Sequence, residues 1–322
     1  MGALIVYLGL AASPIYSIAD LGPATRATSI NNQGQVAGWF TDSTLTDHPL
    51  YPLVSFTGQT HGINDAGQTV GFTADGQAAI WTSGALALLA GPESYALAIN
   101  GSGQIAGAID GQPVRWSNGV AETLGATGAG YAIDSAGNVA GTGELAPGVF
   151  RAFFWSPQTG LNWLPTLGGP TSYGLALNGS GQIAGNSTTT AGYLHAFLRT
   201  GAGMADLGVL AGAATSSATG LNGSGQVVGV SGGAAFLYAN GILIDLNLLI
   251  DPFSGWTLQE AAAINDSGQI AGTGLYQGQR HAFLLDPARQ EESALLTPEP
   301  ASIFLLLLGL ALLAFGVSRR KG

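Results

Sequence analysis

The sequence predicts an all-β fold: a seven-bladed β-propeller of four-stranded antiparallel blades, followed by a C-terminal hydrophobic helix. Three observations support this prediction. A short motif recurs seven times, each copy is followed by further short apolar runs, and an unmatched run near the N-terminus can complete the last unit. A fixed period is typical of repeat architectures, and four short strands per roughly 40 residues are typical of a propeller blade.

The recurring motif joins small apolar residues, a turn tetrad and a second apolar run, as in AAAINDSGQIAG at residues 261–272. An Asn or Asp leads each tetrad, and the seven leaders are Asn31, Asn64, Asn100, Asp134, Asn178, Asn222 and Asn265. An Asn side chain can bond the backbone two residues on, and the glycine of the tetrad can take the positive φ of a G1 bulge. Each copy therefore predicts a tight β-hairpin.

A calcium loop is the alternative interpretation of this polar tetrad. A cation site needs oxygen ligands at fixed positions. The position after the leader is Gly in three of the copies, namely Gly101, Gly179 and Gly223. The motif therefore predicts turns, with no metal site.

Short apolar runs after each hairpin predict the outer strands of the blades. Runs such as RAFFW, HAFLR, AAFLY and HAFLL are followed by a turn and a second run, as in GMADLG and ILIDLN. Trp81, Trp116 and Trp155 stand at the same place at the end of the third strand, where other copies carry Tyr238 or Leu285. That substitution pattern predicts packing.

The two ends of the array predict how the ring closes. The last unit supplies its hairpin and HAFLL but no fourth strand, whereas the run YSIADLG at residues 16–22 belongs to no unit. Pairing the two would remove two exposed sheet edges at once. The first unit has no Asp-Leu-Gly run, so we expect an irregular blade near residues 40–60.

Composition narrows the class of protein. The chain has 322 residues, 51 of them Gly, with 9% charged residues and no Cys. Without Cys there is neither a disulfide framework nor a Cys-based metal site. Three of the nine basic residues are Arg319, Arg320 and Lys321, so the rest of the chain is strongly acidic. An acidic body repels phosphates, which argues against a nucleic-acid partner. No cofactor motif is present.

The termini predict export. Residues 1–15 resemble a signal peptide, with an apolar core followed by small residues. Residues 16–290 hold the repeats, residues 291–297 form a linker, and residues 298–322 form a tail. The uncharged apolar span 301–318 would reach about 27 Å as a helix, close to the roughly 30 Å of a bilayer core. The basic cluster after it should stay cytoplasmic, which places the repeats on the other side of the membrane.

The tail resembles the PEP-CTERM sorting signal of Gram-negative bacteria, through Pro298, Glu299 and Pro300, the Leu-rich span, and Arg319, Arg320 and Lys321. The array resembles HAF repeats, through His195-Ala196-Phe197 and His281-Ala282-Phe283. The resemblance implies export by the general secretory route and processing by an exosortase, a membrane transpeptidase. It also implies a link to extracellular polysaccharide and biofilm, with no established enzymatic role for the repeats.

The same scaffold could carry an enzyme, and the sequence leaves that alternative open. His48, His61, His195 and His281 are the four histidines, and only the last two share a repeat position, which favours structural roles. A secreted carbohydrate-active hydrolase or lyase would need paired carboxylates, and spatial pairs are not visible in a sequence. No catalytic residue is assigned. The Asp of ADLG recurs as Asp20 and Asp206, with Asp245 in a similar place, which indicates a turn or edge role.

Three tryptophans lie outside the packing pattern and are the candidates for ligand stacking. They are Trp39, Trp163 and Trp256. Tryptophan offers a large flat apolar face with a polar edge, which suits sugar rings and protein partners, although ordinary blade packing is the competing interpretation. We therefore expect an exported protein, anchored transiently or stably in the inner membrane and then present at the cell surface. Its expected role is structural or binding, with extracellular polysaccharide as the possible ligand.

Overall fold

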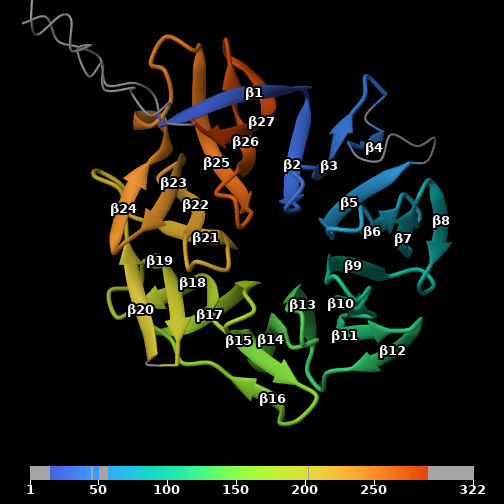
Figure 1. The fold of residues 1–322 in the computed structure, drawn as a ribbon. Helices are drawn as coiled ribbons and strands as arrows, with labels where there is room; N and C mark the ends of the chain where they lie inside the picture. The colour runs from blue at the N-terminus through green and yellow to red at the C-terminus, as the bar shows by residue number, and fades with distance from the viewer. Residues whose placement is uncertain (1–14, 45, 51–56, 202, 289–322) are drawn as a thin grey trace, which may run out of the picture. The chain divides into compact units, whose positions relative to one another are not determined.

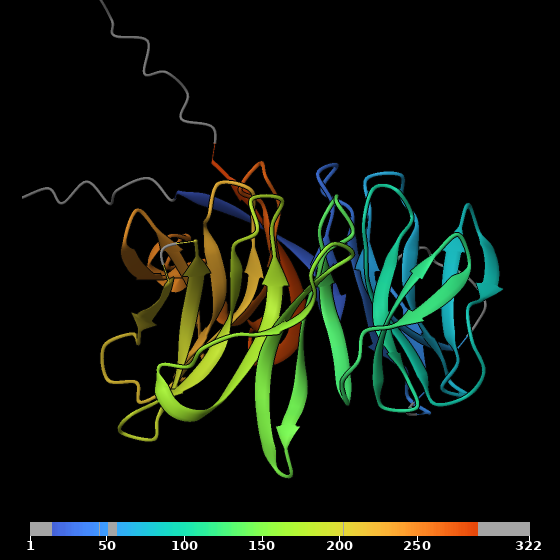
Figure 2. The ribbon, with the colours of Figure 1, turned by 90° about the horizontal axis from the view of Figure 1, so that it is seen from below.

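The computed structural model describes residues 15–44, 46–50, 57–201 and 203–288. Seven antiparallel sheets are arranged in a ring, and each sheet is formed by one stretch of the chain except at the closure (Figure 1). Figure 2 shows the same ring from the side. The predicted all-β seven-bladed propeller is confirmed. The predicted C-terminal helix lies outside the described residues.

Each blade begins with an innermost strand that lines a central channel, and a hairpin then leads outward to the second and third strands. The innermost strands are β2 (Thr25–Ile30), β5 (Gly58–Ile63), β9 (Ser94–Ile99), β13 (Gly128–Ile133), β17 (Gly168–Leu177), β21 (Ser216–Leu221) and β25 (Trp256–Ile264). The second strands are β3 (Val36–Thr41), β6 (Thr69–Thr73), β10 (Ile105–Ile109), β14 (Val139–Ala146), β18 (Ile183–Thr189), β22 (Val227–Ser231) and β26 (Ile270–Tyr276).

The third and fourth strands complete the blades toward the outside. The third strands are β4 (Asp47–Pro49), β7 (Ala78–Thr82), β11 (Gln112–Ser117), β15 (Val149–Ser156), β19 (Leu194–Thr200), β23 (Ala234–Ala239) and β27 (Gln279–Pro287). The outermost strands are β8 (Ala85–Leu88), β12 (Val120–Thr123), β16 (Gly160–Trp163), β20 (Gly203–Gly208), β24 (Ile242–Asp245) and β1 (Tyr16–Pro23). A short 3-10 helix, η1 (Leu246–Leu248), follows β24.

The first hairpin of every blade has the predicted turn chemistry. The tetrad glycines all have positive φ, between 73° and 80°, and they are Gly34, Gly67, Gly103, Gly137, Gly181, Gly225 and Gly268. The leading Asn accepts backbone N–H bonds through its side-chain oxygen, as Asn265 does from Ser267 and Gln269. This turn prediction is confirmed.

A second glycine, seven residues after each leader, brings the inner strands close together. Four of these glycines, Gly141, Gly185, Gly229 and Gly272, face a phenylalanine of the third strand in the register. A Cβ on any of the four would collide with a carbonyl oxygen of the innermost strand and press on that phenylalanine ring. The facing residues, Phe153, Phe197, Phe236 and Phe283, are completely buried. The hairpin-motif glycine therefore packs with the Phe at the His-Ala-Phe position, which reads Arg-Ala-Phe at Phe153 and Ala-Ala-Phe at Phe236.

The ring closes between the two ends of the array, as predicted. Strand β1 pairs antiparallel with β27, so that Tyr16 lies opposite Pro287 and Asp20 lies opposite Phe283 (Figure 1). The seventh blade thus takes three strands from the end of the array and one from its beginning.

The first blade is the irregular one. Among the described residues its sheet has three strands, β2, β3 and β4, and β4 spans only Asp47–Pro49. The expectation of an irregular blade near residues 40–60 is confirmed.

The structure tests the predicted packing of the third-strand tryptophans, whereas the predicted signal and membrane segments lie mostly or wholly outside the described residues. Trp81, Trp116 and Trp155 are at most 6% exposed, so their predicted packing role is confirmed. Residues 15–44, 46–50, 57–201 and 203–288 contain no candidate transmembrane helix. The predicted signal segment at residues 1–15 lies almost wholly outside these ranges, and the linker 291–297 and the span 301–318 lie entirely outside them.

Candidate functional site

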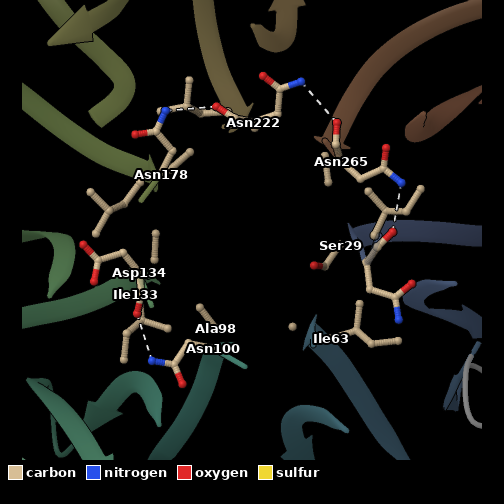
Figure 3. Close-up of a pocket in the computed structure, with 18 of the residues that line it drawn as sticks. Ser29, Ile63, Ala98, Asn100, Ile133, Asp134, Asn178, Asn222 and Asn265 are labelled. Carbon is tan, nitrogen blue, oxygen red and sulfur yellow. Dashed lines mark hydrogen bonds between the residues drawn. The ribbon is translucent and has the colours of Figure 1, made fainter. Parts of the chain in front are cut away.

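The hairpin leaders form a ring of hydrogen bonds at one end of the channel (Figure 3). In six of the seven blades, the side-chain Nδ2 of the leader donates to the backbone carbonyl of the leader in the next blade, over 2.8–3.1 Å. The same Nδ2 donates to the residue four positions on, as Asn31 does to Gln35. Five of these six Asn side chains also accept two backbone N–H bonds through Oδ1, which uses both donors and both acceptor sites of the amide, whereas Asn222 accepts the N–H of Gln226.

The ring is interrupted at one place, between Asp134 and Asn178. Both Asp134 oxygens accept hydrogen bonds within its own turn, from Ala136 and from the backbone and side chain of Asn138. A carboxylate has no donor to offer the next blade. The sequence substitutes Asp for Asn and Asn for Gln together in this copy, which preserves the turn but not the link between blades.

Every innermost strand carries a β-bulge three residues before the leader. The register against the second strand skips one residue in each case. The skipped residues are Thr28, His61, Leu97, Tyr131, Leu175, Thr219 and Ala262. A bulge can redirect a side chain, and all seven of these residues line the channel. These residues were not predicted from the sequence, although each stands three positions before a leader and could have been found by that constant spacing.

The channel contains two chambers that share this ring of bulge residues as lining. The Asn-ring chamber, about 580 Å³, is lined by residues from the bulges to the turns of all seven blades. The Arg26 chamber, about 360 Å³, lies toward the starts of the innermost strands. Its walls include two cross-strand pairs at equivalent positions of adjacent blades: Arg26 opposite Trp39, and Glu260 opposite Thr273.

His61 belongs to the wall of the Arg26 chamber and is packed among aromatic rings. Its ring centroid lies 5.3 Å from those of Trp39 and Phe72. Its Nε2 is buried and has no hydrogen-bond partner among the described residues. Burial lowers the pKa of His61 to about 4, so the imidazole is neutral at physiological pH.

The three predicted stacking tryptophans lie in different blades and are not brought together. Trp39 lines the Arg26 chamber. Trp163 lies edge-on to Phe153, with ring centroids 6.2 Å apart, and Trp256 stacks on Tyr276 at 5.2 Å. Of the three, only Trp39 is among the described residues that line these two chambers.

The His-Ala-Phe histidines are paired with the Asp-Leu-Gly aspartates on the outer strands. His195 Nδ1 lies 2.9 Å from Asp206, and His281 Nδ1 lies 2.8 Å from Asp20. Each aspartate also accepts the backbone N–H two residues on, which agrees with the predicted turn role. Sequence reasoning did not connect the two motifs, although His and this Asp occur together in both copies.

Within the described ranges, no three His, Asp or Glu side chains form a metal-binding group. The sorting residues Pro298, Glu299, Pro300, Arg319, Arg320 and Lys321 lie outside the described residues.

The chain is similar in structure to solved proteins of low sequence identity. The structure titled "YCF48 bound to D1 peptide" matches with a TM-score of 0.55 and 12% identity, over 88% of this chain and 98% of that chain. A gluconolactonase, XC5397 from Xanthomonas campestris, matches with a TM-score of 0.46 and 14% identity, over 86% and 99%. The likeness with a TM-score of 0.55 indicates a shared fold alone, because the identity is only 12%.

No curated protein sequence matches the chain. One protein-family model matches, over residues 296–321. The C-terminal end of this propeller chain thus carries a PEP-CTERM protein-sorting motif, which implies export and sorting to the cell surface.

Proposed function

We propose that the protein is a cell-surface binding protein, processed by an exosortase, whose propeller recognises a glycan of the extracellular matrix at the Arg26 chamber. The observation that carries the proposal is Trp39, a partly exposed aromatic ring in the wall of a 360 Å³ chamber that also holds charged and hydroxyl side chains. This volume is within the range of small-ligand sites, about 300–1,000 Å³, and aromatic faces with a few polar groups suit sugar rings.

In this proposal, the tail is the sorting signal that directs the protein to the cell surface. Pro298, Glu299 and Pro300 are the recognition element of the matched motif, the span 301–318 dwells in the membrane, and the final basic cluster holds the terminus in the cytoplasm. Processing by the exosortase then releases the propeller to the exterior. A role in the exopolysaccharide matrix or a biofilm follows from that location.

The chamber chemistry favours binding over glycan cleavage. Glycoside hydrolysis ordinarily requires two carboxyl groups on either side of the scissile bond. Glu260 is the one carboxylate among the described residues that line the Arg26 chamber. In the Asn-ring chamber, hydrogen bonds within or between the turns engage Asp65, Asp134 and Asp266. We therefore propose a protein without enzymatic activity.

A glycan panel tests this proposal directly. The full-length chain would be screened for binding and, in parallel, for the release of reducing ends or unsaturated products. We expect binding without cleavage, and loss of binding in Trp39→Ala. Trp163→Phe and Trp256→Phe are the matched controls, because each keeps an aromatic ring in its packing site. Undiminished binding by Trp39→Ala, or cleavage of a bound glycan, would contradict the proposal.

A further inference from the structure

The seven blades differ in the charge of the residue that stands five positions before each leader. This position lies near the start of the innermost strand, and its occupants are Arg26, Gln59, Tyr95, Ala129, Tyr173, Ser217 and Glu260. Five blades form with a neutral residue there, so the fold does not require a charge at this position. Arg26 and Glu260 are therefore local departures from the repeat that call for another explanation.

The two charged residues lie in the two blades that meet where the ring closes. Arg26 is on β2 of the first blade and Glu260 is on β25 of the seventh, and both line the Arg26 chamber. Among the described residues, neither side chain has an ion pair or hydrogen bond, and the two are not within ion-pair distance of each other. By contrast, Arg115 pairs with Glu122 at 2.8 Å.

Other polar groups of the chamber wall already have partners inside the protein. The hydroxyl of Thr28 donates to the carbonyl of Thr60, and that of Thr219 donates to the carbonyl of Ala261, in each case in the following blade. These hydroxyls hold neighbouring blades together. The free charges of Arg26 and Glu260 are therefore the strongest polar features that the chamber offers to a ligand.

We infer that the Arg26 chamber selects a sugar unit bearing both a carboxylate and an amino group, which rests on the proposed glycan-binding function. The Arg26 guanidinium pairs with the carboxylate, since its fork of donors matches two carboxylate oxygens. Glu260 accepts from the ammonium group. Trp39, opposite Arg26 in the sheet, stacks on the sugar ring.

The charge of the whole protein supports a ligand with compensated charges. The chain has a formal net charge of −10, and such a body repels a densely anionic polymer over long range. A unit with one negative and one positive group has no net charge to repel. Arg26 and Glu260 still offer a partner of opposite sign to each of its two charged groups.

Binding of four monosaccharides that differ in their charged groups would distinguish a requirement for charge from sugar binding in general. Muramic acid carries both groups, glucosamine only the amine, glucuronic acid only the carboxylate, and glucose neither. Titration calorimetry on the full-length chain should give a Kd for muramic acid about tenfold or more below those of the other three, as expected for two charge-assisted contacts. Arg26→Gln and Glu260→Gln should each remove most of this preference.

The charge inference and the proposed glycan binding would be contradicted by different results. Arg199→Gln and Glu93→Gln change the same charges outside the chamber and should leave all four Kd values unchanged. Equal binding of glucose and muramic acid, or a preference that survives Arg26→Gln, would overturn the charge inference and leave glycan binding standing. Absence of binding by all four sugars would overturn the charge inference, and a negative result on the glycan panel would separately overturn the proposed function.

Discussion

His281 Nδ1 lies 2.8 Å from Asp20 Oδ1, a contact that joins residues 261 positions apart. Asp20 is on β1 and His281 on β27, so the pair links the two strands that close the ring. The equivalent pair in the fifth blade, His195 and Asp206, joins the neighbouring strands β19 and β20. The same local contact therefore has a different role at the closure, where it holds the N-terminal strand of the propeller.

Replacing His281 by Ala should loosen β1. The pair is partly exposed, so we expect a loss of only about 1 kcal/mol, or about 2–4 °C in Tm. Hydrogen exchange should show faster exchange at residues 16–22. His195→Ala is the control, because it removes the same kind of pair without touching the closure. Unchanged exchange at β1 in His281→Ala would show that the contact does not secure the ring.

Acid should weaken the same closure. Burial by itself raises the pKa of Asp20, but the hydrogen bonds from His281 and from the N–H of Gly22 outweigh it, and the pKa is lowered overall. A carboxyl with a lowered folded-state pKa stabilises the fold above its unfolded pKa of 3.8, and that contribution is lost as the pH falls further. The exchange of residues 16–22 should therefore rise below about pH 4, and less so in Asp20→Asn.

The glycine seven residues after each leader should be far less tolerant than the glycine of an open turn. At Gly107 a Cβ would overlap the carbonyl oxygen of Tyr95 and touch Trp116, whereas at Gly101 nothing lies within 4 Å. Gly107→Ala should destabilise by about 1–3 kcal/mol or more. Gly101→Ala should be neutral or slightly stabilising, because it restricts the unfolded chain. Equal Tm values for the two variants would contradict the packing explanation.

The sequence predicted the parts of the fold that depend on local chemistry. The turn at each leader, the positive φ of Gly268 and the pairing of residues 16–22 with the last unit follow from turn preferences and from an unmatched strand. Contacts between blades were not predicted. The bond from Asn31 to the carbonyl of Asn64 spans 33 positions, and only the ring geometry brings those atoms together.

The candidate site was less predictable than the fold, for a similar reason. Trp39 was identified because it departs from the packing pattern, but its neighbours Arg26 and His61 were not, since the chamber is assembled from separate blades. Comparing the copies position by position at fixed offsets from the leader would have found the charged pair Arg26 and Glu260. Their distance in space was still not accessible, because it depends on closure between the first and last blades.

Completing the Asn ring should stabilise the propeller. Asp134 lacks the donor that links other leaders to the next blade, so the double variant Asp134→Asn with Asn138→Gln restores the pair found in six copies. We expect a gain of about 0.5–1.5 kcal/mol, the usual net contribution of one hydrogen bond, seen as a higher Tm. The reverse change at another blade, Asn222→Asp with Gln226→Asn, should lower the Tm by a similar amount. A double variant no more stable than the parent would indicate that the missing link has no energetic consequence.

His61 should make the propeller less stable in mild acid. Burial lowers its pKa to about 4, against 6.5 when unfolded. The unfolded state therefore binds more protons between these values, so the stabilisation is complete above pH 6.5 and is lost as the pH falls toward 4. This lowering of the His61 pKa corresponds to at most about 3 kcal/mol in the free energy of unfolding. His61→Phe keeps an aromatic ring beside Trp39 and Phe72 and should flatten the Tm profile between pH 7 and 4; an unchanged profile would exclude His61 as the cause.

The tail should act as a sorting signal and should not contribute to the stability of the folded propeller. The last strand ends at Pro287, and β1 already completes its blade, so truncation after Leu296 removes no strand of the ring. We expect an unchanged Tm for the truncated chain. In a host with an exosortase, the parent should lose the C-terminal segment, whereas replacing Pro298, Glu299 and Pro300 by Ala should leave the uncleaved form in the inner membrane, detected through a C-terminal tag. If that triple variant is processed and released like the parent, the matched motif at residues 296–321 does not direct sorting, and the apolar span is better explained as a membrane anchor.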